Sequence, residues 1–176
     1  MIYNILQNTR RNKIIFLLLL VVGCWLLVYQ RAQAYELSVS SVKNEADRGE
    51  YIPVSIYLDT KGENINAIEG EISIPDGGSV SELNDANSAI SFWLEKPNFN
   101  EKNNIVYFSG VIPGGFISDK IFLFSFNFSQ NKSGKTSLIF KNIQAFLNDG
   151  SGTVVKGSGK NFSINISRIS GVVVTQ

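Results

Sequence analysis

The chain has 176 residues, a formal net charge of +1, a single cysteine and no histidine. This composition excludes active sites that depend on a histidine base, and it excludes soft-metal sites built from histidine and several cysteine thiolates. Residues 1–34 hold four of the 16 basic residues and none of the 15 acidic ones, so the rest of the chain is mildly acidic, with 12 against 15. An acidic chain without basic blocks is a poor nucleic-acid binder, and we expect no nucleic-acid partner.

Residues 1–34 have the pattern of a secretory signal peptide. Arg10, Arg11 and Lys13 precede an apolar run at residues 14–29, and the segment closes with an A-x-A motif that ends at Ala34. As a helix the run spans about 24 Å, which is less than the ~30 Å of a hydrocarbon core. We therefore expect cleavage after Ala34 and a secreted or cell-surface protein, with a retained N-terminal anchor as the alternative.

Cys24 offers a second interpretation of the same segment. It follows Val21-Val22-Gly23, as in a lipoprotein cleavage site, but the apolar run continues past the cysteine, where a mature lipoprotein turns polar. A chance match within the apolar run is the favoured interpretation. The mature domain then has no cysteine, so it must be stabilised by burial alone.

Beyond residue 34 the chain consists of short alternating segments separated by Gly, Asn, Asp and Pro, and no segment has the periodicity of a long helix. Nine strands are predicted, at residues 35–42, 51–59, 65–74, 80–83, 88–94, 105–110, 121–128, 136–147 and 161–169. Between them we expect a loop at residues 95–104 and a long turn at residues 111–120. This spacing is typical of an all-β sandwich or barrel. Residues 171–176 are expected to form a tail. Its apolar ending is typical of a chain that is truncated before a C-terminal anchor.

The segment at residues 65–74 is predicted to be the central strand of the domain. Ile68 and Ile72 point to one face, while Glu69 and Glu71 point to the other, because successive side chains of a strand alternate. Gly70 interrupts the apolar face and indicates a close approach of another segment. The strand therefore has one core face and one acidic face.

Three other strands carry specific expectations. In residues 51–59, Pro53 predicts a sheet edge, because proline donates no ladder hydrogen bond. In residues 121–128, four phenylalanines at alternate positions predict one aromatic core face. In residues 136–147, the apolar phase shifts near Lys141-Asn142, which indicates a β-bulge.

The polar residues give little support to catalysis or metal binding. Glu69 and Glu71, with Cα atoms roughly 6.5–7 Å apart, could form the carboxylate pair of a glycoside hydrolase, but two solvated surface glutamates are the simpler interpretation. Residues 148–153 resemble part of a calcium loop, but Asp149 is their only carboxylate, so a glycine-rich turn is favoured. We expect no enzyme, no metal and no cofactor.

Exposed aromatic residues could stack on sugar rings instead. Trp93, Phe99, Tyr107 and Phe116 are the candidates near loops or edges, and core filling is the alternative for each. Trp93 follows Phe92 directly, so one of the two must face outward in a regular strand.

Six sequence motifs together resemble a cohesin domain over residues 35–169. They are N-A-I-E-G-E-I-S-I (66–74), S-A-I-S-F-W-L-E-K-P (88–97), I-V-Y-F-S-G (105–110), P-G-G-F (113–116), I-F-L-F-S-F-N-F (121–128) and L-N-D-G-S-G-T (147–153). The resemblance implies a nine-stranded jelly-roll β-sandwich at residues 35–170, related in fold to bacterial carbohydrate-binding modules. It also implies a non-catalytic module that binds a calcium-loaded dockerin through one sheet face. By position, the candidate partner-binding residues are Asn66, Glu69, Glu71, Trp93 and Tyr107.

The leading hypothesis is therefore a secreted or cell-surface, cohesin-like module that recruits a protein partner in a polysaccharide-degradation context. The alternatives are direct carbohydrate binding and a structural domain of a larger envelope protein. In each case, membrane contact is expected only through the N-terminal leader or a C-terminal anchor.

Overall fold

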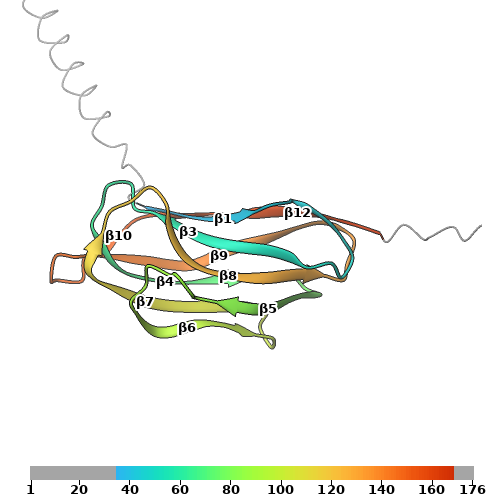
Figure 1. The fold of residues 1–176 in the computed structure, drawn as a ribbon, viewed down its shortest axis with the longest axis horizontal. Coiled ribbons are helices and arrows are strands. Elements are labelled where there is room, and N and C mark those ends of the chain that lie inside the picture. The colour runs from blue at the N-terminus through green and yellow to red at the C-terminus, as the bar shows by residue number, and fades with distance from the viewer. Residues whose placement is uncertain (1–34, 169–176) are drawn as a thin grey trace, which may run out of the picture. The chain divides into compact units, whose positions relative to one another are not determined.

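The computed structural model describes residues 35–168, and all regular secondary structure among them is β (Figure 1). The strands are β1 (Glu36–Ser41), β2 (Glu45–Asp47), β3 (Ile52–Asp59), β4 (Ile65–Ser73), β5 (Gly78–Asn84), β6 (Phe92–Asn100), β7 (Ile105–Phe116), β8 (Ile121–Gln130), β9 (Gly134–Leu147), β10 (Val154–Val155), β11 (Ser158–Lys160) and β12 (Phe162–Ser167). Nine of these strands have six residues or more, and each overlaps one of the nine predicted strands; the other three have two or three residues and were not predicted. Over residues 35–168, no helix is long and apolar enough to cross a membrane.

The predictions for residues 1–34, for Cys24 and for residues 171–176 lie outside the described residues.

The strands form two sheets that pack face to face. One sheet has the order β11-β1-β3-β8-β5; the other has the order β2-β12-β9-β4-β7-β6, with β10 also paired to β9. Most neighbours are antiparallel, but β1 pairs with β11, and β12 with β2, in parallel. The predicted all-β sandwich is confirmed.

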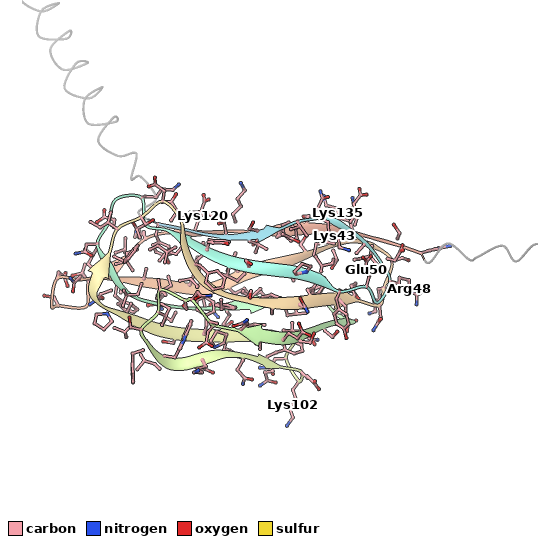
Figure 2. The ribbon with its side chains drawn as sticks, viewed as in Figure 1. Lys43, Arg48, Glu50, Lys102, Lys120 and Lys135 are labelled. Atoms are coloured by element: carbon pink, nitrogen blue, oxygen red, sulfur yellow. The ribbon has the colours of Figure 1, made fainter. Side chains whose placement is uncertain are left out.

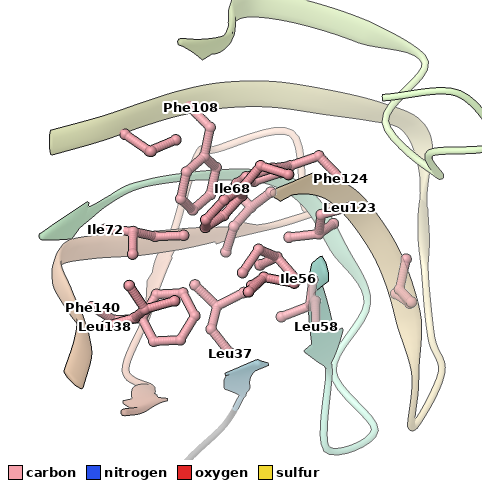
Figure 3. Close-up of a cluster of buried hydrophobic side chains, with 14 of the residues drawn as sticks. Leu37, Ile56, Leu58, Ile68, Ile72, Phe108, Leu123, Phe124, Leu138 and Phe140 are labelled. Carbon is pink, nitrogen blue, oxygen red and sulfur yellow. The ribbon is translucent and has the colours of Figure 1, made fainter. Parts of the chain in front are cut away.

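The core lies between the two sheets and is built from their inward-facing aliphatic and aromatic side chains (Figure 3). Ile68, Ile72 and Phe108 come from one sheet and meet Ile56 and Phe124 of the other; all five are almost completely buried. Charged side chains instead project from the surface of the sandwich, as Figure 2 shows for several lysines. This segregation is what the alternating pattern predicts, because each strand has one buried face and one solvated face.

Strand β4 is confirmed as a central strand with a core face. It lies between β9 and β7, and Ile68 and Ile72 are buried while Glu69 and Glu71 are half-exposed. Gly70 marks a close approach, as predicted: a Cβ there would lie 2.8 Å from Ile143 Cγ2. The predicted bulge of β9 is also present, because the β4–β9 register shifts beside Asn142, whose φ is +49°.

The prediction that four phenylalanines share one face of β8 is wrong for Phe122. The β3–β8 register shifts so that Ile56 pairs with Phe124 and Tyr57 pairs with Phe122, which leaves Leu123 as an extra residue. A bulge reverses the alternation beyond it. The ring of Phe122 therefore lies on the outer face against Tyr57, with ring centroids 5.7 Å apart.

The prediction of an edge at Pro53 holds only locally. Strand β3 lies between β1 and β8, so it is a central strand. The pairing with β1, however, ends where Ser41 is opposite Val54, one residue short of Pro53. The proline therefore sits at the end of this ladder, where its missing N–H costs little.

Two predicted connections prove to be largely strand. The predicted loop at residues 95–104 is strand as far as Asn100, and the predicted turn at residues 111–120 is strand as far as Phe116. Strand β6 is an edge strand, where its polar side chains remain solvated, and its pairing with β7 shifts register on both sides of Glu95.

Candidate functional site

The outer face of the seven-stranded sheet carries an acidic row across its central strands. Glu69 on β4 is directly opposite Ser109 on β7 and Gln144 on β9, and Ser109 is in turn opposite Glu95 on β6. Directly paired residues of antiparallel strands share a face, so these four side chains form one row that crosses the sheet. No lysine or arginine lies in this row, and its net charge is therefore negative.

A second polar row runs beside it. Glu71 on β4 is opposite Tyr107 on β7 and Lys141 on β9. The Glu71 carboxylate accepts a hydrogen bond of 2.9 Å from Asn142 Nδ2, in the bulge of β9. The Tyr107 hydroxyl accepts one of 2.8 Å from Asn103 Nδ2. These contacts orient the carboxylate and the phenol at the surface.

On the other side of the acidic row lies a row of apolar side chains. Phe92 on β6, Val111 on β7, Ala67 on β4, Phe146 on β9 and Val154 on β10 are successive cross-strand partners. Phe92 is 60% exposed and Val154 is 54% exposed, so both ends of the row are open to solvent. An apolar row beside an acidic row offers a protein partner both an apolar surface to bury and a charge to complement.

Asn66 lies at one end of this surface, at a register shift of β4 between Ile65 and Ala67. Its Nδ2 donates to Asn148 Oδ1 at 3.5 Å, and Asn148 Nδ2 donates to the Gly114 carbonyl at 2.7 Å. The two asparagines therefore tie β4, β7 and the segment after β9 together. They fix the backbone next to the apolar row.

Trp93 does not lie on this surface. It is opposite Gly110 on β7, and its indole packs against the core ring of Phe124, with centroids 6.4 Å apart. The preceding residue, Phe92, takes the outward position instead. Among the predicted partner-binding residues, the structure therefore brings Glu69, Glu71 and Tyr107 together, places Asn66 beside them, and turns Trp93 inward against the core.

Comparison with family models and with curated proteins gives no match for this sequence. Solved structures do match. A non-cellulosomal cohesin from the hyperthermophilic archaeon Archaeoglobus fulgidus superposes with a TM-score of 0.61 at 20% identity, over 77% of this chain and 92% of that one. The cohesin module of a family 33 glycoside hydrolase from Clostridium perfringens has a TM-score of 0.62 at 12% identity, over 78% and 99%. A type I cohesin–dockerin complex from Clostridium thermocellum has a TM-score of 0.62 at 11% identity, over 78% and 96%.

The chain has the cohesin fold. The resemblance seen in the six sequence motifs is confirmed at the level of the fold, which is what likeness at these identities establishes. Each of the three matches covers most of the cohesin concerned.

Sequence reasoning missed most of the apolar row on this cohesin-like sheet. Val111 fell in a predicted turn, and neither Phe92 nor Phe146 was distinguished from core residues. One signal was available, since adjacent Phe92 and Trp93 required one outward aromatic side chain. The local pattern contains nothing that tells which of the two it is.

The acidic residues of the described cohesin-like module do not gather into a metal centre. Over residues 35–168, no group of three or more Asp, Glu, His or Cys side chains is placed to hold a metal ion. The Asp149 carboxylate is used within its own turn, where it accepts hydrogen bonds from the Ser151 N–H, at 2.8 Å, and from Thr153. These bonds hold the pKa of Asp149 below its ordinary value, the hydrogen bond from the Thr153 side chain contributing most.

Proposed function

We propose that the chain is a non-catalytic, cohesin-like binding module that recruits a protein partner of the dockerin type. The contact surface is the outer face of β6, β7, β4 and β9, together with β10, and we call it the docking face. The observation that carries the proposal is the apolar row from Phe92 to Val154 lying directly beside the acidic row from Glu95 to Gln144.

The apolar row supplies the free energy of association. Phe92 is a large aromatic side chain that is 60% exposed, and burying it against a partner removes that apolar surface from water. Large aromatic side chains that become buried in a contact commonly account for much of the binding energy. The central strands beneath the row are covered by the core on their other side, so the surface is preformed.

The acidic row determines what kind of partner fits. Glu69 and Glu95 face outward with no basic side chain in their row, so a partner with lysine or arginine beside an apolar stripe complements the surface. An acidic partner meets like charges, which lowers both its association rate and its affinity. The expected partner therefore presents a basic, amphipathic surface.

The solved structures that match this chain support the proposal. Several are cohesins solved together with a dockerin, including complexes from Clostridium thermocellum and R. flavefaciens. The Clostridium perfringens module belongs to a glycoside hydrolase, which supports a polysaccharide-degradation context. The signal-peptide pattern of residues 1–34 supports secretion or display at the cell surface.

A charge-reversal experiment tests the proposal. The full chain and its Glu69→Lys/Glu71→Lys variant are immobilised and exposed to native secreted proteins, with and without a calcium chelator. The control variant is Glu45→Lys/Asp47→Lys, which reverses two exposed acids at the same spacing on β2, at the far edge of the same sheet.

We expect a chelator-sensitive protein partner to bind the wild type and the β2 control but not the β4 variant. Melting temperatures should be nearly equal, since exposed substitutions usually change stability by less than ~0.5 kcal/mol. Equal binding by the β4 and β2 variants would show that the docking face is not the contact surface.

A further inference from the structure

The outer face of the other sheet carries a groove that the docking face does not involve. The groove has a volume of ≈ 390 Å³ and lies over β3, β8 and β5. Its lining includes six outward-facing residues, Pro53, Ser55, Glu82, Asn84, Ser125 and Asn127, together with Val54, Leu83 and Phe126.

The groove exists because a row of small side chains crosses three neighbouring strands. Ser55 on β3 is opposite Ser125 on β8, which is opposite Asn84 on β5. No hydrogen bond within residues 35–168 engages the hydroxyls of Ser55 and Ser125. The floor of the groove therefore consists of short polar side chains, and the two serine hydroxyls can exchange hydrogen bonds with a ligand.

Larger side chains stand on both sides of this row. On one side Pro53 is opposite Asn127; on the other, Tyr57 is opposite Phe122. Pro53 and Asn127 belong to the lining of the groove, whereas Tyr57 and Phe122 lie beyond it.

One carboxylate is held at the rim of the groove. Strand β5 bulges between Ser81 and Asn84, and Glu82 there has a φ of +51°. Asn127 Nδ2 donates to Glu82 Oε2 at 2.7 Å, which fixes the carboxylate at the groove. Glu82 belongs to none of the ion pairs formed between described residues, and no lysine or arginine lines the groove.

This lining selects a chemical class of ligand. An anionic ligand would face Glu82 with no cation to offset its charge. An apolar ligand would strip water from the serine hydroxyls and the carboxylate without replacing their hydrogen bonds. A neutral ligand with many hydroxyl groups can donate to Glu82 and exchange hydrogen bonds with Ser55 and Ser125, while its C–H surface rests on the Pro53 ring.

We propose that this groove binds a neutral polysaccharide chain, laid across β3, β8 and β5. The site is separate from the docking face, since the outer faces of the two sheets of a sandwich point in opposite directions. A polysaccharide and a protein partner can then be bound at the same time, and the module links the two.

Affinity electrophoresis of the full chain tests the proposal. The gels contain hydroxyethyl cellulose, xylan or mixed-linkage β-glucan as neutral probes, and polygalacturonate as the anionic probe. Ser55→Trp fills the floor of the groove, and Ser40→Trp is the matched control, because Ser40 is the β1 partner of Ser55 in the same row but lies outside the lining. We expect retardation by at least one neutral probe, weakened about tenfold or more by Ser55→Trp and unchanged by Ser40→Trp.

A second variant guards against a folding defect in the first. Glu82→Gln keeps the shape of the rim and removes its charge, and we expect weaker retardation on the neutral probe because a charge-assisted hydrogen bond is lost. Three results would overturn the proposal: no retardation by any neutral probe, stronger retardation on polygalacturonate, or equal retardation of the wild type and both groove variants. Saturation of the groove by a peptide in place of the polysaccharide would also overturn it.

Discussion

The indole of Trp93 on β6 packs edge-on against the ring of Phe124 on β8, with the ring planes at 74°. The contact bridges the two sheets of the sandwich. Gly110 makes room for the indole, because a Cβ there would lie 2.9 Å from Trp93 Cε3 and 2.4 Å from Ile90 Cγ2. Trp93 is therefore a partly buried residue that packs against the core, and its neighbour Phe92 occupies the docking face.

The two adjacent aromatics of β6 should respond differently to truncation. We expect Trp93→Ala to lower the free energy of unfolding by about 3 kcal/mol, because it leaves a cavity between the sheets. Phe92→Ala should cost less than ~0.5 kcal/mol, since its side chain is mainly solvated. Urea denaturation of both variants measures the difference, and equal costs would contradict this assignment of inner and outer faces.

Phe92 should instead matter for association. Phe92→Ser is expected to weaken partner binding by about tenfold or more, as loss of an aromatic anchor commonly does. Tyr51→Ser is the matched control, since Tyr51 is 58% exposed and precedes β3, off the docking face. Titration of each variant with the purified partner gives the two affinities, and a weakening of similar size in both would argue against the apolar row.

The bulge of β8 makes a prediction for two phenylalanines in one strand. Phe124→Ala should cost about 3–5 kcal/mol, because Phe124 is fully buried. Phe122→Ala should cost about 1 kcal/mol, because its ring is half-exposed on the outer face. Chemical denaturation distinguishes this from four phenylalanines on one core face, for which both substitutions would be equally severe.

Gly70 should not tolerate even a methyl group. Gly70→Ala places a Cβ 2.8 Å from Ile143 Cγ2 and 3.0 Å from Phe108 Cζ, and such overpacking typically costs about 1–3 kcal/mol. Ser109→Ala, an outward-facing change on the neighbouring strand β7, should stay within ~0.5 kcal/mol. If the melting temperature of Gly70→Ala equals that of the wild type, β9 moves aside without a loss of stability.

The Asp149 carboxyl group, in the turn after β9, should titrate in acid. The pKa of Asp149 is lowered in the folded chain, so its contribution to stability is complete above the unfolded pKa of about 3.9 and is lost as the pH falls through the folded value. A carboxyl NMR titration should show a midpoint below that of an ordinary aspartate. Thr153→Val removes the hydrogen bond that lowers the pKa of Asp149 most, so it should raise the midpoint of the Asp149 titration. An unchanged midpoint would mean that the Thr153 hydroxyl is not the donor.

The local sequence was sufficient to predict the class of fold and to locate the nine longer strands, but not β2, β10 and β11, nor the full extent of β6 and β7. The isoleucine and glutamate faces of residues 65–74, the close approach at Gly70 and the bulge near Asn142 all follow from patterns within a few residues. Each is a property of one strand and its immediate neighbours, and such properties are encoded by side-chain period and by glycine.

Only the tertiary structure decided how the strands line up. Whether Phe92 or Trp93 faces outward, which five side chains form the apolar row, and whether Phe122 joins the core or lies on the outer face all depend on register and on bulges. Register is determined by hydrogen bonds between segments far apart in the chain, and one inserted residue exchanges the two faces of a strand. Both candidate binding surfaces are products of cross-strand pairing, and for that reason neither could be assembled from the sequence alone.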